Sequence, residues 1–351
     1  MKIHKKVLVV ATSSSTRGGI TAVINAHQKS SFWEKWNCTW IETHIDKSIL
    51  HKIVFFLFAF LKYLYFLASS SLVHIHLSGP VSAIRKYIFL VIAKIFKKPI
   101  IIHFHAFSSK SSIPKSHKNL YKIIFGMADK IIVLSDNWRR GLIKDFKYNS
   151  EKVNVIQNPC PIIDKKNKTA SKKIILYAGT LNPRKGYLDL IRSFSKIAID
   201  YSDWKLVLAG NGEIQKGKNL AKKLNILDQV VFTGWISGEV KHEVFSEASI
   251  FCLPSYAEGF PMAVLDAWAY HLPVISTPVG GIPDVAIDGD NILLCNPGDI
   301  DCLEKSIRCI IEDKQLHKKL INASKEFSKG LFSIAEISLK WDELYCDLHN
   351  K

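Results

Sequence analysis

The chain has 351 residues, of which 48% are apolar, so it is longer than one domain usually grows and can fill two globular cores. Seven scattered cysteines without a C-x-x-C pair argue against a disulfide framework and fit a reducing cytosol. The net charge of +17 lies entirely in residues 1–160, where 24 Lys and Arg outnumber 7 Asp and Glu (24 − 7 = 17).

The basic first half favours an anionic partner, either a phosphate-bearing substrate or an anionic membrane surface. It contains no helix-turn-helix, zinc or RNA-recognition signature, so nucleic acid is not expected as a partner.

Short apolar runs alternate with helical stretches in both halves, the pattern of parallel sheets covered by helices. First-half strands are expected near residues 6–11, 38–42, 72–77, 99–104, 130–134 and 153–156. Gly18 and Gly19 follow the first strand in an Arg-Gly-Gly turn that lacks a full G-x-G-x-x-G. Two interpretations stay open: a loop that lets a phosphate approach the backbone, and a plain tight turn.

The stretch Ile53 to Ala68 is apolar on all sides and is predicted to be helical. Sixteen helical residues reach about 24 Å, short of a hydrocarbon core of roughly 30 Å, and Lys62 interrupts them, so a single membrane span is not expected. The helix is either buried in the first domain or dips into a membrane interface, with basic residues nearby.

Four histidines end two of these strands. His103 and His105 are predicted to point to one side of their strand because side chains alternate, and His74 and His76 repeat the pattern. The pair His103 and His105 could bind a metal only poorly, because the sequence suggests no third ligand. A structural role is the commoner fate of such histidines.

A proline-rich and then charged segment, 158–168, is expected to link the domains. The next strand, 173–178, ends in Gly179-Thr180-Leu181-Asn182-Pro183-Arg184-Lys185-Gly186, ahead of a helix that begins near Tyr187. The strand 206–209 ends in a glycine-rich turn at Gly210, and the strand 230–234 precedes Trp235.

The segment 258–267, E-G-F-P-M-A-V-L-D-A, follows an apolar strand and opens a helix near Pro261. Glu258 is therefore predicted in a loop just before a helix N-terminus, where free N–H groups and a partial positive charge suit an anion. Asp266 follows eight residues later on the same helical face as Met262.

These motifs together resemble family 4 of the retaining glycosyltransferases. Glu258 and Asp266 resemble its E-x7-E signature, with Asp in place of the second Glu, and Lys185-Gly186 matches its G-R-L-x-x-x-K-G turn. Thr180 stands where the family usually has Arg, and Arg184 could supply that cation. The resemblance is dense from about 173 to 300.

The resemblance implies a role for each site residue. Arg184 and Lys185 would hold the donor diphosphate, Glu258 the hydroxyls of the donor sugar, and His105 would position that sugar. These four are the expected catalytic residues. The expected donor-binding residues are Gly18, Gly19, Gly179, Thr180, Gly210, Trp235, Gly259, Phe260, Met262, Ala263 and Asp266, the last holding the ribose.

The implied fold is α/β of the GT-B type, with two facing Rossmann-like domains and a cleft between them. The N-terminal acceptor or membrane-facing domain is expected over 1–162 with a returning helix at about 337–351, and the C-terminal donor domain over 163–336. No cofactor or metal is expected, and the Asp288-Gly289-Asp290 sequence is interpreted as a loop rather than a metal site.

The implied function is retaining transfer from a UDP- or GDP-sugar to a lipid-linked or other saccharide, in surface-polysaccharide (capsule or O-antigen) biosynthesis. A polyprenyl-diphosphate-linked acceptor and a position on the inner face of the cytoplasmic membrane would explain the basic half. Two alternatives stay open: a nucleotide-sugar epimerase or hydrolase of the same fold, and a non-catalytic nucleotide-sugar- or membrane-binding partner of another transferase.

Overall fold

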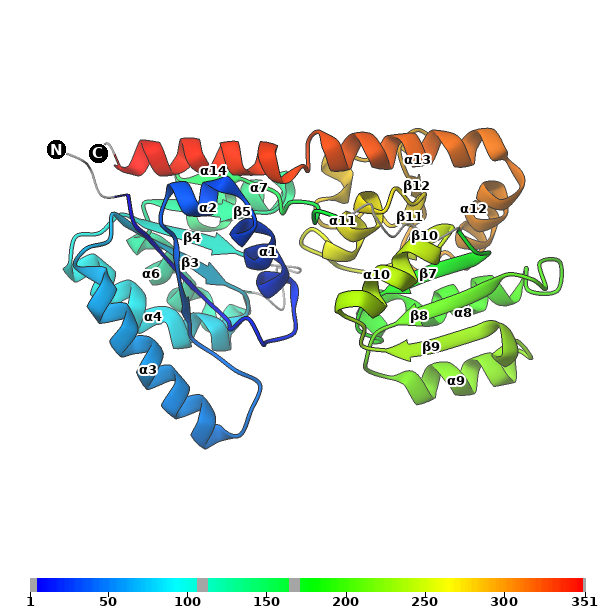
Figure 1. Ribbon diagram of the computed structural model, residues 1–351, viewed down its shortest axis with the longest axis horizontal. Helices are drawn as coiled ribbons and strands as arrows, with labels where there is room; N and C mark the ends of the chain where they lie inside the picture. Colours follow the sequence, from blue (N-terminus) through cyan, green and yellow to red (C-terminus); the bar gives the residue numbers. More distant parts are fainter. Residues whose placement is uncertain (1–4, 106–112, 164–170, 350–351) are drawn as a thin grey trace. The chain divides into compact units, whose positions relative to one another are not determined.

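The computed structural model describes residues 5–105, 113–163 and 171–349, which form two compact units (Figure 1). The first unit comprises Met1–Pro159 and Ile334–Lys351, and the second comprises Cys160–Ser333. Each unit is built around a six-stranded parallel sheet.

The six strands expected in the first half are confirmed. They are β1 (Val7–Ala11), β2 (Thr39–Glu42), β3 (Leu72–Leu77), β4 (Ile100–Phe104), β5 (Lys130–Val133) and β6 (Val153–Val155). Their order is β2-β1-β3-β4-β5-β6, so the winding direction reverses between β1 and β3. Ligands of such sheets bind outside the carboxyl ends of the strands at this reversal.

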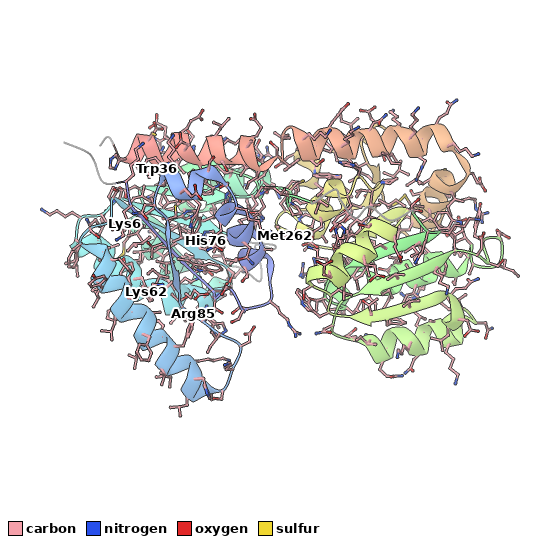
Figure 2. All side chains as sticks on the ribbon, in the orientation of Figure 1. Lys6, Trp36, Lys62, His76, Arg85 and Met262 are labelled. Carbon is pink, nitrogen blue, oxygen red and sulfur yellow. A yellow bond between two sulfur atoms is a disulfide. The ribbon has the colours of Figure 1, made fainter. Side chains whose placement is uncertain are left out.

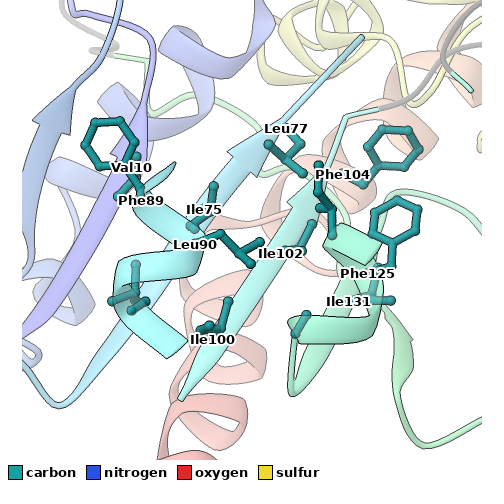
Figure 3. Packing of buried hydrophobic residues seen from close by; sticks show 14 of the residues in the cluster. Val10, Ile75, Leu77, Phe89, Leu90, Ile100, Ile102, Phe104, Phe125 and Ile131 are labelled. Atoms are coloured by element: carbon teal, nitrogen blue, oxygen red, sulfur yellow. The ribbon is translucent and has the colours of Figure 1, made fainter. Parts of the chain in front are cut away.

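Helices cover both faces of the first sheet. They are α1 (Gly19–Gln28), α2 (Ser31–Lys35), α3 (Ile49–Leu67), α4 (Pro80–Ile95), α6 (Lys118–Met127), α7 (Asp136–Phe146) and α14 (Ile334–His349). Because side chains alternate along a strand, Ile75 and Ile102 enter one core, with Phe89 and Phe125 (Figure 3). Leu72 and Ile101 enter the core on the other face, which α14 helps to fill.

The C-terminal helix α14 belongs to the first unit although it follows the second in sequence, as expected. Trp341 and Tyr345 are almost fully buried in the same core as Trp36, and the Trp36 ring meets Tyr345 edge-on. Asp342 accepts hydrogen bonds from Lys35 Nζ and Trp36 Nε1, both at 2.7 Å. Apolar packing and this polar contact together fix the returning helix.

Helix α3 is mostly exposed, so the interpretation of 53–68 as a buried helix is wrong. An inner stripe of Ala59, Tyr63 and Leu67 packs on the unit, and the Tyr63 hydroxyl donates to the Phe89 carbonyl at 2.7 Å. Most other side chains face outward, including Phe58 at 67% exposure. Among the described residues α3 is the single helix long and apolar enough to cross a membrane, with a mean hydropathy of 1.7.

The second unit repeats the plan of the first. Its strands are β7 (Ile174–Ala178), β8 (Lys205–Ala209), β9 (Val230–Gly234), β10 (Ile250–Leu253), β11 (Val274–Ser276) and β12 (Leu293–Leu294). Its helices are α8 (Tyr187–Ser195), α9 (Ile214–Lys223), α10 (Gly238–Glu247), α11 (Met262–Ala269), α12 (Ile300–Glu312) and α13 (Lys314–Lys329). The strand order β12-β11-β10-β7-β8-β9 places the reversal between β7 and β10.

Cys295 and Cys302 form a disulfide, which the cysteine count did not predict. Cys295 follows β12 directly, Cys302 lies in the first turn of α12, and their Cα atoms are 5.6 Å apart. The other cysteines are free, so a single local bridge is present rather than a framework.

Replacing Trp341 tests how much α14 stabilises the first unit. Trp341→Ala is expected to lower the free energy of unfolding by about 3–5 kcal/mol, because it leaves a cavity in a closed core. Urea unfolding followed by circular dichroism measures it. The control Leu339→Ala, at an exposed position of the same helix, is expected to stay within about 0.5 kcal/mol. Equal losses in the two variants would contradict the packing described for α14.

Candidate active site

The turn that follows β7 is pressed against the end of β10. Residues Pro183–Lys185 form a single 3-10 turn that ends at Gly186, whose φ is 67°. A Cβ atom on Gly186 would lie 2.0 Å from the Pro254 carbonyl oxygen, so only glycine fits there. The glycine therefore brings Arg184 and Lys185 to the reversal point of the sheet.

Glu258 lies in the loop after β10 and is 7% exposed. Its Oε1 accepts hydrogen bonds from Lys185 Nζ at 2.5 Å and from Ser255 Oγ at 2.7 Å. Arg184 Nη1 lies 3.5 Å from Glu258 Oε2 and donates to the Ala257 carbonyl at 2.5 Å. Residues 73 positions apart thus form one charged cluster. The sequence indicated the two motifs separately, and their contact is a finding of the structure.

Backbone and hydroxyl hydrogen bonds hold the Glu258 loop in place. Tyr256 N donates to the Arg184 carbonyl at 2.7 Å, and Thr277 Oγ1 donates to the Ser255 carbonyl at 2.6 Å. Gly281 N donates to the Gly259 carbonyl at 2.7 Å. The loop is therefore tied to three neighbouring segments, and the carboxylate has a fixed position.

Helix α11 begins directly after this loop. Gly259 and Phe260 are buried, Pro261 is the N-cap residue, and Met262 and Ala263 form the first turn. The first N–H groups of a helix lack intrahelical acceptors and carry a partial positive charge. The end of α11 beside the cationic cluster is therefore suited to an anion, as the sequence indicated.

Asp266, one turn further along α11, is 8% exposed and has a partner that the sequence analysis missed. Its Oδ1 lies 2.7 Å from Nζ of Lys241 on α10. Burial raises the pKa of Asp266, and Lys241 opposes that rise. Asp266, which replaces the second Glu of the family motif, is thus paired with a lysine.

The remaining second-unit residues line the ends of β7, β8 and β9. A Cβ on Gly210 would lie 1.9 Å from the Gly179 carbonyl oxygen, so these two turns approach closely. Thr180 is exposed. The Trp235 backbone N–H donates to Asn211 Oδ1 at 2.9 Å, and the Trp235 side chain is 43% exposed.

Gly18, Gly19 and His105 belong to the first unit. The two glycines are exposed after β1, and His105 follows β4, so all three lie beyond the carboxyl ends of strands. His105 Nε2 is 2.9 Å from His76 Nδ1. Burial, and then the nearby Lys86, lower the pKa of His105 to about 3, so its imidazole is neutral at neutral pH.

The structure groups His103 with His74 and His76 as possible metal ligands, and not with His105, the partner that the sequence suggested. His74, His76 and His103 place their possible ligand nitrogens within 4.8 Å of one another. His74 and His76 come from β3, which pairs with β4 in the register His76 to His103. Strand pairing across 27 residues carried no signal in the sequence.

The Asp288-Gly289-Asp290 loop is occupied by structural contacts. Asp288 Oδ1 accepts from Leu294 N at 2.8 Å, and Asp290 pairs with Lys319 at 2.8 Å.

Sequence reasoning assigned no role to Ser255, Thr277, Asn211 or Lys241. Ser255, Thr277 and Asn211 fix loops through short polar contacts, and Lys241 pairs with the buried Asp266. Only the position of Ser255, three residues before Glu258, was a usable signal. The roles toward a ligand that the sequence implied for the catalytic and donor-binding residues stay predictions.

Two doubly wound parallel-sheet units, with a cationic cluster and a helix N-terminus at one reversal point, define the class as GT-B-type proteins. Comparison with known families agrees. The family described as Glycosyltransferase Family 4 matches residues 23–162, and the one described as Glycosyl transferases group 1 matches residues 161–327. The chain therefore belongs to glycosyltransferase family 4.

Curated relatives include a glycosyltransferase of Haemophilus influenzae, 31% identical over 61% of this chain and 60% of that protein. The N-acetyl-alpha-D-glucosaminyl L-malate synthase of Bacillus anthracis is 30% identical over 51% and 46%. These matches thus span about half the length of those relatives. A Campylobacter jejuni N-acetyl-D-galactosaminyltransferase, whose name includes a PP-undecaprenol-linked saccharide, is 24% identical over 74% and 72%.

Solved structures confirm the fold. Anabaena HepE in complex with UDP and glucose aligns with a TM-score of 0.75 and 16% identity, covering 98% of this chain and all of that one. Sucrose-phosphate synthase of Thermosynechococcus elongatus aligns with a TM-score of 0.78 and 20% identity, covering 98% and 99%.

The Asp266–Lys241 pair makes stability depend on pH in a defined direction. Burial raises the pKa of Asp266 in the folded protein above its pKa in the unfolded chain. Asp266 therefore contributes most to stability below the unfolded-state pKa, and this contribution is lost as the pH rises through the folded-state pKa. Lys241→Met removes the charge that opposes this rise, so the folded-state pKa of Asp266 increases further and the loss of stability extends to higher pH. The variant is expected to lose about 2 kcal/mol at pH 7 and less at pH 4.

Urea unfolding of Lys241→Met at the two pH values measures this effect. Adding Asp266→Asn should restore most of the loss, and Lys241→Arg should lose little, because it keeps the charge. A loss of the same size at both pH values would show that Lys241 acts through packing alone.

Proposed function

We propose that the protein transfers a sugar from a nucleoside diphosphate sugar, UDP- or GDP-linked, to a saccharide acceptor with retention at the anomeric carbon. One observation carries the proposal. Lys185, Arg184 and Glu258 meet at the reversal point of the second sheet, beside the N-terminus of α11.

The charges of this cluster suit a diphosphate. Two cations face one carboxylate, so the group has a net charge of +1, and the helix terminus adds a partial positive charge. Each charge-assisted hydrogen bond to a phosphate oxygen is worth about 1.5–3 kcal/mol. Lys185 and Arg184 would bind the diphosphate and stabilise the charge that builds on it as the sugar departs.

The other site residues would orient the donor. Glu258, fixed by Ser255, would accept hydrogen bonds from sugar hydroxyls, and Asp266 would accept from the ribose. The exposed Trp235 and the turn at Gly210 would lie near the base. His105, a neutral imidazole, would hydrogen-bond the sugar without adding a positive charge.

Retention follows in this proposal from attack on the face that the leaving group vacates. The departing phosphate takes the proton of the acceptor hydroxyl, so the step needs no carboxylate nucleophile. We expect it to need no metal. The Campylobacter relative, whose name contains a PP-undecaprenol-linked saccharide, supports a lipid-linked acceptor of surface-polysaccharide type.

Replacing Lys185 tests the donor site. Wild-type protein is expected to be stabilised by UDP or GDP, and by the matching nucleotide sugar, by about 2.7 kcal/mol at a hundred times the dissociation constant. Lys185→Met should remove most of this gain, because it deletes a phosphate contact. Thermal unfolding with and without each nucleotide measures it.

The matched control is Lys222→Met, an exposed lysine of α9 in the same unit, which should respond like wild type. Stabilisation by no nucleotide, or stabilisation that Lys185→Met retains in full, would refute the donor site. Once an acceptor is found, the coupling constant of the product's anomeric proton reports retention or inversion.

We further propose that α3 docks the protein on the anionic cytoplasmic face of a membrane. Nine apolar side chains of α3 are exposed: Ile49, Leu50, Ile53, Val54, Leu57, Phe58, Leu61, Leu64 and Tyr65. The neighbouring α4 adds Val81, Ile84, Ile88 and Ile95. We call these thirteen residues the apolar face.

The charge around the apolar face favours anionic lipid. Residues 47–128 contain twelve Lys and Arg and no Asp or Glu. Lys62 on α3 and Arg85 on α4 are labelled in Figure 2. Each basic residue near an anionic surface contributes about 1 kcal/mol, and each buried apolar side chain adds to it.

Vesicle sedimentation tests this docking. Wild-type protein is expected to bind vesicles that contain phosphatidylglycerol, and less so at 1 M salt, where the Debye length is about 3 Å. Leu57→Ser with Leu61→Ser should weaken binding at least tenfold. Both positions are exposed, so the fold should persist. Ile199→Ser, an exposed change in the second unit, is the control; an equal loss there would count against α3.

A further inference from the structure

The histidines at the ends of β3 and β4 form a group that the proposed transfer reaction does not use. His74 and His76 share one face of β3, and His103 faces them from β4. They are 4%, 2% and 1% exposed, and their possible ligand nitrogens lie within 4.8 Å of one another. His76 lies inside the first unit (Figure 2).

Several of these nitrogens lack a hydrogen-bond partner. His103 Nδ1 and Nε2 and His74 Nε2 are all buried and have no partner among the residues that the structure describes. A buried polar atom left unpaired costs about 1–3 kcal/mol, and native structures seldom tolerate several together. A bound cation would engage one nitrogen of each ring, His74 Nε2 and one of the two His103 nitrogens among them.

Two other side chains supply the outer contacts that metal-binding histidines usually have. His74 Nδ1 is 2.6 Å from the Tyr345 hydroxyl, and His76 Nδ1 is 2.9 Å from His105 Nε2. With Nδ1 of both rings engaged, their Nε2 atoms can serve as ligands. A ligand imidazole is generally oriented in this way, through its second nitrogen.

Binding one ion requires the rings to reorient, because the lone pairs of stacked imidazoles do not converge on one point. The rings of His74 and His76 are stacked with centroids 4.5 Å apart, and those of His74 and His103 are 5.6 Å apart. A tetrahedral zinc ion with bonds of 2.0–2.1 Å needs ligand nitrogens about 3.4 Å apart. The ligand nitrogens, now up to 4.8 Å apart, would therefore have to move closer together when the ion binds.

The ligand type selects the ion. Imidazole favours zinc, copper and nickel, whereas magnesium, calcium and manganese favour oxygen ligands. Three imidazoles fill three of the four positions of a tetrahedral ion, so the fourth would be taken by water or hydroxide, as in three-histidine zinc sites. We propose that His74, His76 and His103 bind one divalent transition-metal ion, with zinc as the best fit.

This site lies wholly within the first unit, whereas the diphosphate contacts proposed above lie in the second. Through its contact with His76 the ion would orient His105, which the proposed reaction uses to hold the sugar. Binding of the ion does not require that reaction, and it can be tested without a donor or an acceptor.

The test is zinc binding by the whole chain after treatment with EDTA and dialysis. Isothermal titration should give one equivalent of Zn²⁺ per chain and none of Mg²⁺. The melting temperature should rise by about 5 °C with Zn²⁺ at a hundred times its dissociation constant. His74→Gln and His103→Gln should each weaken binding at least a hundredfold, whereas the exposed His51→Gln on α3 should not.

X-ray absorption of the wild-type zinc protein covers the case in which the variants fail to fold. Three imidazole ligands would support the site, and one or none would overturn it. Absence of Zn²⁺ uptake by wild type, or uptake that survives in a folded His103→Gln variant, would also overturn it.

Discussion

The site of the second unit depends on one interaction, the contact of the Glu258 carboxylate with Lys185. A carboxylate that is 7% exposed needs partners, because burying a charge without them is costly. Lys185 and Ser255 bind the same oxygen, and Arg184 lies near the other. The two loops at the reversal point of the sheet are thereby held together by charge as well as by backbone.

That contact exists because the backbone permits it. Only a residue without a Cβ fits at Gly186 against the Pro254 carbonyl, and the same holds at Gly210 against Gly179. Parallel strands then place the ends of β7 and β10 side by side. Family membership and fold agree with this arrangement, whereas the donor, the acceptor and the stereochemistry are our proposals.

The two faces of the sheet in the first unit differ in composition. One face carries an apolar core with Phe89 and Phe125, and the other carries histidines beneath Trp341 and Tyr345. Burial keeps these imidazoles neutral by lowering the pKa of each well below its usual range. Outside the core, α3 leaves an apolar surface in a segment that is free of acidic residues.

The sequence by itself determined the strands, the α14 helix and the two motifs around Lys185 and Glu258, because local periodicity and motif spacing record them. Tertiary structure decided the rest. Exposure of α3 depends on what packs against it. The Lys185–Glu258 contact, the Lys241–Asp266 pair and the grouping of His103 with His74 and His76 depend on neighbours that are distant in the chain. Such contacts arise only when strands and helices meet in space, so no local pattern predicts them.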